Sequence, residues 1–143
     1  MIKFKYFFGS DSRSLPFLST LHDEISNLKV ITLPPKSKGR GRKSTSNPVE
    51  TFCIENNIDC DYFDDSKNYH DMEYGIVASF SKIFSNYFLE NNSQLFNIHL
   101  SLLPKYRGPT PVETAILNKE IEGGYTVFKI DKNIDTGKII FQN

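Results

Sequence analysis

Residues 2–33 read IKFKYFFGSDSRSLPFLSTLHDEISNLKVITL, and this stretch indicates the fold. Residues 2–8 are apolar enough for a buried strand, and the small polar residues at 9–12 suit a tight turn and a helix start. Apolar side chains then recur at helical spacing, which predicts a helix over residues 15–28 with one apolar face. Residues 30–33 are short and β-branched and predict a second strand.

The same alternation continues along the rest of the chain. Residues 34–48 contain no hydrophobic side chain and predict an exposed loop. The later expected elements are a helix at 49–56, a strand at 58–62, a strand at 75–79, a helix at 83–89, a strand at 95–99, a helix at 111–118 and closing strands at 125–130 and 139–141. We therefore predict one α/β domain over residues 1–143, with a mostly parallel, doubly wound (Rossmann-like) sheet flanked by helices. Ligands of such sheets bind beyond the carboxyl ends of the strands, which draws attention to the loops after Phe8, Ser79 and His99.

Composition narrows the range of functions. Lys plus Arg and Asp plus Glu both number 17, so the formal net charge is zero and no global attraction to nucleic acid or membrane is indicated. Cys53 and Cys60 match no metal or redox spacing and are expected to be reduced thiols. No apolar stretch is long enough to span a bilayer, and the N-terminus lacks the pattern of a secretion signal. We expect a cytoplasmic monomer with no metal and no membrane partner.

A basic loop concentrates the positive charge. Five cations fall within eight residues, interleaved with two glycines: Lys36, Lys38, Arg40, Arg42 and Lys43. This pattern is typical either of a solvated surface loop without a partner or of contact with a phosphate backbone. A phosphate cradle is disfavoured because the Gly-x-x-x-x-Gly-Lys-Ser/Thr spacing is missing.

Polar side chains end the strand at 95–99. Asn97 and His99 are two residues apart, so they project from one face of that strand, where they cost desolvation unless they face a cleft. A satisfied structural histidine is the alternative. Asp135 lies in an Asp-Thr-Gly turn between the two closing strands. An Asp/His pair could move protons and Asn97 could donate to an oxyanion, which are the functions that acyl transfer needs.

Residues 96–108, FNIHLSLLPKYRG, closely resemble the signature of the folate-dependent formyltransferase family. Asp135-Thr136-Gly137 falls where that family carries its catalytic aspartate. Residues 108–112 and the basic residues at 39–43 are similar to the branch that formylates methionyl-tRNA. The resemblance covers nearly the whole chain.

The resemblance implies a role for each matching residue. Asn97, His99 and Asp135 would perform the chemistry. The donor would be 10-formyltetrahydrofolate, and the acceptor would be the α-amine of initiator methionyl-tRNA in translation initiation. The tetrahydrofolate site would be lined by Ser101, Leu102, Leu103 and Pro104, and its pterin would be approached by Ser79, Phe80 and Ser81. The tRNA would be contacted by Lys38, Arg40, Arg42 and Lys43.

The sequence also departs from the family pattern. Leu100 stands where proline is usual, and residues 79–81 lack the glycine that usually follows an aromatic residue there. The family continues beyond position 143, so we expect a C-terminally incomplete catalytic domain without a C-terminal tRNA-binding domain. Two alternatives stay open. The acceptor could be another amine, on an amino-sugar nucleotide or glycinamide ribonucleotide, or the chain could be a truncated, non-catalytic module that binds folate or RNA.

Overall fold

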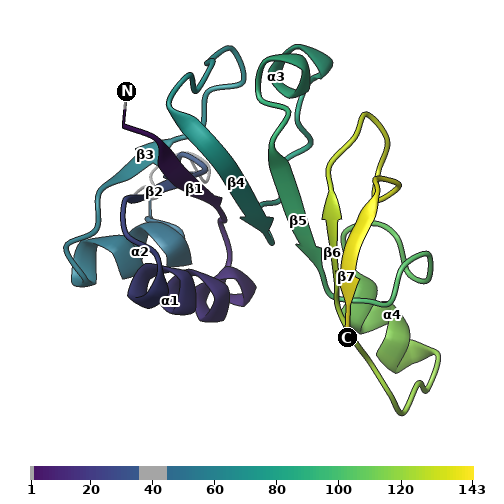
Figure 1. Cartoon of the computed structure of the whole chain (residues 1–143). Coiled ribbons are helices and arrows are strands. Elements are labelled where there is room, and N and C mark those ends of the chain that lie inside the picture. The colour runs from purple at the N-terminus through teal and green to yellow at the C-terminus, as the bar shows by residue number, and fades with distance from the viewer. Residues whose placement is uncertain (1, 36–44) are drawn as a thin grey trace, which may run out of the picture.

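A computed structural model describes residues 2–35 and 45–143 (Figure 1), so the basic residues at 36–44 lie outside the described chain. The described part folds around one seven-stranded sheet in the order β3-β2-β1-β4-β5-β6-β7. Along the chain the elements are β1 (Phe4–Phe8), the 3-10 helix η1 (Ser12–Ser14), α1 (Leu15–Glu24), β2 (Leu28–Thr32), α2 (Pro48–Glu55), β3 (Cys60–Tyr62), β4 (Met72–Ala78), α3 (Asn86–Asn91), β5 (Leu95–His99), α4 (Pro111–Leu117), β6 (Thr126–Lys129) and β7 (Ile139–Gln142).

The predicted α/β sheet is confirmed. Strands β1 to β5 pair in parallel, whereas β6 and β7 join antiparallel at one edge. Strand β5 lies between the two types of pairing, with Asn97 opposite Val77 of β4 and Phe128 of β6. No helix within the described residues is long and apolar enough to cross a bilayer.

Alternating side chains of β1 build a core on each face of the sheet. Phe7 is fully buried with Leu18 of α1 and Val49 of α2 on one face. Phe8 is fully buried on the other face, where it meets Phe88 of α3 edge-on, with ring centroids 6.3 Å apart. Strands β1, β4 and β5 are parallel neighbours in the sheet, so their carboxyl ends lie side by side (Figure 1).

Two predicted helices have different bounds in the structure. The helix expected at 15–28 ends at Glu24, because Asn27 takes a left-handed conformation, with φ of 60°, and Leu28 already belongs to β2. The helix expected at 83–89 begins at Asn86, because the side chain of Ser85 caps it by accepting from the backbone of Phe88. Residues 83 and 84 are thereby left in an irregular loop.

A polar network ties β1, β2 and the start of β4 together near the amino ends of these strands. The carboxylate of Asp71 accepts hydrogen bonds from Tyr6 Oη and Lys29 Nζ, both at 2.7 Å. Partial burial acts to raise the pKa of Asp71, but the hydrogen bonds from Lys29 and Tyr6 outweigh it, and the pKa is lowered.

We expect Asp71→Asn to lower the free energy of unfolding by about 1–2 kcal/mol near neutral pH, since the negative charge is lost and one of the two acceptor oxygens becomes an NH2 group that cannot accept. A carboxylate whose pKa is lowered by folding stabilises the protein above its unfolded pKa and loses that contribution as the pH falls through its folded pKa. The gap between wild type and variant should therefore close below about pH 4. Urea unfolding across pH measures this, with the exposed Asp59→Asn as control. A gap that stays constant down to the acid end would contradict the assignment.

Candidate active site

A cavity of about 460 Å³ opens at the carboxyl ends of the parallel strands. Its walls come from the turn after β1, the loop after β4, the end of β5 and the loop between β6 and β7. The three loops expected to carry a ligand site thus converge. The volume falls in the range of pockets that hold small-molecule ligands and cofactors.

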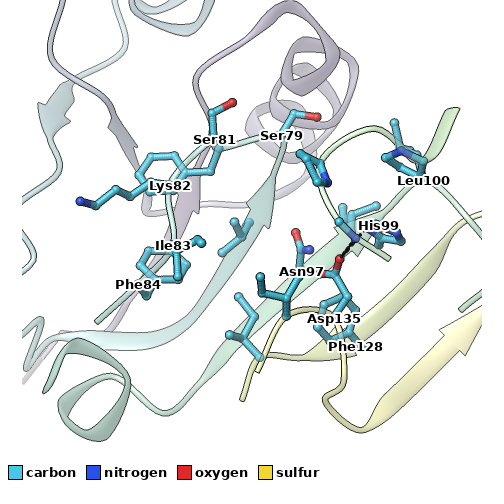
Figure 2. A pocket seen from close by; sticks show the side chains of 18 of the residues that line it. Ser79, Ser81, Lys82, Ile83, Phe84, Asn97, His99, Leu100, Phe128 and Asp135 are labelled. Atoms are coloured by element: carbon cyan, nitrogen blue, oxygen red, sulfur yellow. Dashed lines mark hydrogen bonds and ion pairs between the residues drawn. The ribbon is translucent and has the colours of Figure 1, made fainter. Parts of the chain in front are cut away.

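The end of β5 and the β6–β7 loop bring His99 and Asp135 together (Figure 2). His99 Nδ1 lies 3.6 Å from Asp135 Oδ2, and the two side chains are only 6% and 13% exposed. The backbone N–H of Gly108 donates to Asp135 Oδ2 at 2.7 Å, and the Nε2 of His99 lies 2.8 Å from the carbonyl oxygen of Tyr106. The imidazole and the carboxylate are therefore both held in fixed orientations at the cavity wall.

Asn97 lies one pleat before His99 on the same face of β5 and also lines the cavity. Its backbone is paired in the sheet, which fixes the position of its side chain. Within the described part of the chain, no group hydrogen bonds the side-chain amide of Asn97. Strand alternation predicted that Asn97 and His99 share one face, and both residues line the cavity.

The opposite wall is the loop of residues 79–84 (Figure 2). Ser79 and Ser81 both take positive φ values, 46° and 57°. Ser10 Oγ donates to the carbonyl of Phe80 at 2.7 Å, so the turn after β1 holds this loop. A serine therefore adopts the left-handed conformation for which the family pattern uses glycine, at a conformational cost that the surrounding hydrogen bonds must offset.

The residues at 101–104 lie differently from those at 79–81. Ser101 is buried, and its hydroxyl donates to the carbonyl of Lys105 at 2.6 Å. Leu103 is also buried, while Leu102 and Pro104 are exposed. None of these four residues is among those that line the cavity. Their contact with folate stays a prediction that rests on the resemblance.

The cavity also contains side chains that sequence reasoning missed. Arg13 bridges the turn after β1 to α4, because its guanidinium pairs with Asp11 at 3.1 Å and with Glu113 at 3.2 Å. Phe84, in the 79–84 loop, and Ile130, which follows β6, add apolar surface to the cavity. No local pattern marks Arg13, since its partner Glu113 is 100 residues away in sequence.

Among residues 2–35 and 45–143, no group of three or more His, Cys, Asp or Glu side chains is arranged to hold a metal ion. Cys53 and Cys60 are free thiols, and neither lines the cavity. Among the polar side chains that line the cavity, His99, Asp135 and Asn97 lie together at the end of β5 and in the facing β6–β7 loop.

Comparison with known proteins identifies the family to which this chain belongs. Residues 10–143 match the family model described as formyl transferase. The chain belongs to the formyl transferase family. Methionyl-tRNA formyltransferase from Clostridioides difficile (strain 630) is 35% identical over 147 aligned positions, which cover 95% of this chain and 47% of that protein. The chain thus spans about half the length of the curated relatives that it matches.

Solved formyltransferases share the fold. Phosphoribosylglycinamide formyltransferase from Bacillus halodurans superposes with a TM-score of 0.74 at 21% identity, covering 99% of this chain and 78% of that one. An N-formyltransferase from Helicobacter canadensis, solved with folinic acid and dTDP-3-aminofucose, gives 0.72 at 29% identity, covering 100% and 52%. The first likeness concerns the fold alone. The second likeness is to a protein that was crystallised with a folate and an amino-sugar nucleotide.

Proposed function

We propose that this chain transfers a formyl group from 10-formyltetrahydrofolate to the α-amine of methionyl-tRNA, and that residues 1–143 belong to the catalytic domain. The observation that carries the proposal is the pairing of His99 with Asp135 beside Asn97 in one cavity. The similarity to a methionyl-tRNA formyltransferase supports the acceptor. The folate in the Helicobacter canadensis structure supports the donor.

In the proposed reaction one bond forms, one bond breaks and one proton is transferred. A bond forms between the formyl carbon and the acceptor nitrogen, and the bond from that carbon to the folate nitrogen breaks. The acceptor nitrogen loses one proton and the folate nitrogen gains one. The acceptor must attack as a neutral amine, which is accessible near neutral pH because a free α-amine has a pKa of about 7.7–8.0.

The three polar side chains have separate roles in this chemistry. Asn97 and the imidazolium form of His99, which carries an N–H on both ring nitrogens, donate hydrogen bonds to the formyl oxygen as negative charge builds on it. The carboxylate of Asp135 places a negative charge next to the imidazole and acts as the base for the proton that leaves the amine. Fixed donors in a partly enclosed cavity favour the charged state without having to reorganise.

The donor side of the cavity is the 79–84 loop. Ser79, Phe80 and Ser81 line it, and Phe84 and Ile130 add apolar surface suited to a ring system. Backbone polar groups of a loop with left-handed residues can meet the polar edge of a pterin, while the aromatic side chains exclude water. The proposal therefore places folate between this loop and His99.

The basic residues around position 40 are proposed to contact the phosphates of the tRNA. We expect the double variant Arg40→Ala/Arg42→Ala to weaken methionyl-tRNA binding by about tenfold at low salt and to reduce its salt dependence, since two phosphate contacts are lost. Binding measured over a salt series tests this. The control is Lys3→Ala/Lys67→Ala, which removes the same charge elsewhere. An equal loss in both double variants would point to net charge alone.

An amino-sugar nucleotide is the second candidate acceptor, because the Helicobacter canadensis protein was solved with one. Both acceptors can be offered to the chain with the same folate donor, and the formylated products can be separated by mass. We expect transfer to methionyl-tRNA to exceed transfer to a dTDP-amino sugar. Preference for the sugar would reverse the assignment of acceptor and leave the reaction centre unchanged.

A further inference from the structure

The two nitrogens of the His99 ring have different neighbours. Nε2 lies 2.8 Å from the backbone carbonyl of Tyr106. A carbonyl oxygen can only accept a hydrogen bond, so Nε2 must carry the proton. The bond at one ring nitrogen thereby decides which tautomer the neutral imidazole adopts.

The other ring nitrogen is not committed to such a bond. Nδ1 is 3.6 Å from Asp135 Oδ2, beyond the range of an N–H···O hydrogen bond. That oxygen already accepts from the N–H of Gly108 at 2.7 Å. Nδ1 is therefore the nitrogen of His99 that is free to meet a ligand next to Asp135.

One short turn supplies both constraints. The carbonyl that faces His99 belongs to Tyr106, and the N–H that holds Asp135 belongs to Gly108, two residues later. Both residues take positive φ, 55° and 98°. A small rotation of this turn would move the acceptor for His99 and the donor for Asp135 together.

Side-chain contacts outside the cavity hold the turn in place. Tyr106 Oη donates to Glu120 Oε1 at 2.6 Å, and Lys105 Nζ pairs with the same oxygen at 3.0 Å. The hydrogen bonds from Tyr106 and Lys105 lower the pKa of Glu120, which favours the ionised acceptor. Neither Tyr106 nor Glu120 lines the cavity, so any effect of theirs on catalysis must pass through the turn.

We infer that Tyr106 and Glu120 are positioning residues for His99. The hydroxyl of Tyr106, held on Glu120, fixes the turn at 106–108, whose carbonyl keeps the His99 proton on Nε2 and leaves Nδ1 to work with Asp135. Only the identity of the ligand that meets Nδ1 rests on the proposed function. The tautomer itself is a property of the protein without substrate.

Nitrogen-15 NMR of the histidine rings tests the inference directly, at a pH where the histidines are neutral. The chain has three histidines, so His22 and His70 serve as internal references. The variants are Tyr106→Phe and Glu120→Gln. The matched control is Tyr62→Phe, which removes another exposed hydroxyl bonded to a glutamate, Glu50, away from the cavity.

We expect wild-type His99 to be predominantly protonated on Nε2. In both variants the share of the Nδ1-protonated tautomer should rise by about fivefold, because the carbonyl is no longer held in place. The Tyr62→Phe control should match wild type. Predominant Nδ1 protonation in the wild type would overturn the inference, and so would variants whose tautomer ratio equals that of wild type. Neither result depends on formyl transfer, so the proposed function stands or fails separately.

Discussion

Asp135→Asn is expected to reduce formyl transfer by about 10²–10⁴-fold while leaving the fold intact. Asparagine has the same shape, tolerates the left-handed backbone of this position, with φ of 53°, and can still accept the hydrogen bond from Gly108. Only the charge 3.6 Å from His99 is lost. The rate of formylation under saturating folate donor measures the effect.

Two controls separate chemistry from folding in that experiment. The thermal midpoint of Asp135→Asn should stay close to that of wild type, and the exposed Asp23→Asn should keep full activity. A variant that retains activity within a few-fold of wild type would remove Asp135 from the proposed mechanism. A large fall in the thermal midpoint would instead assign it a structural role.

Gly137→Ala is expected to have the largest effect on stability. An added Cβ would clash with the carbonyl oxygen of Lys129, a backbone atom of β6, which cannot move aside as a flexible side chain can. We expect the free energy of unfolding to fall by about 3 kcal/mol, at the upper end of the range for overpacking. Activity should fall as well, because Asp135 lies two residues away on the same loop.

The matched control is Gly123→Ala, where an added Cβ meets no atom within 4 Å. Denaturant unfolding should show this control as equal to or slightly more stable than wild type, since alanine restricts the unfolded chain. Equal stabilities of Gly137→Ala and Gly123→Ala would show that β6 and the β6–β7 loop are not packed as described.

The sequence patterns predicted the strands of the sheet, because the spacing of apolar residues and the length of each apolar segment are local properties of the chain. The apolar runs at 2–8 and 95–99 contain the strands Phe4–Phe8 and Leu95–His99, and Asn97 and His99, which alternate along the second strand, both line the cavity. The short helix at 86–91 was placed too early, since the apolar residues 83 and 84 suggested helix where they form a loop. Ser85 carried the local signal of a cap that the apolar pattern masked.

Local sequence patterns could predict only part of the candidate site. No periodicity connects Asp135 to His99, which are 36 positions apart, and their pairing was predicted from the family resemblance and a general acid/base argument. Arg13 reaches the cavity only because β1 lies next to β4 in the sheet. Long-range neighbours of this kind depend on strand order, which an individual segment does not encode. The basic residues at 36–44 and the folate contacts of 101–104 stay predictions.

We expect His99 to be required for formyl transfer. Transfer from 10-formyltetrahydrofolate to methionyl-tRNA can be measured for wild type and for His99→Ala, with the folding of both proteins followed by circular dichroism. Wild type should form formylated methionyl-tRNA, and the folded variant should lose at least about 10²-fold in rate. Equal rates for the two proteins would show that His99 has no part in the transfer, and a folded wild-type chain that forms no product with any amine acceptor offered would exclude the proposed reaction.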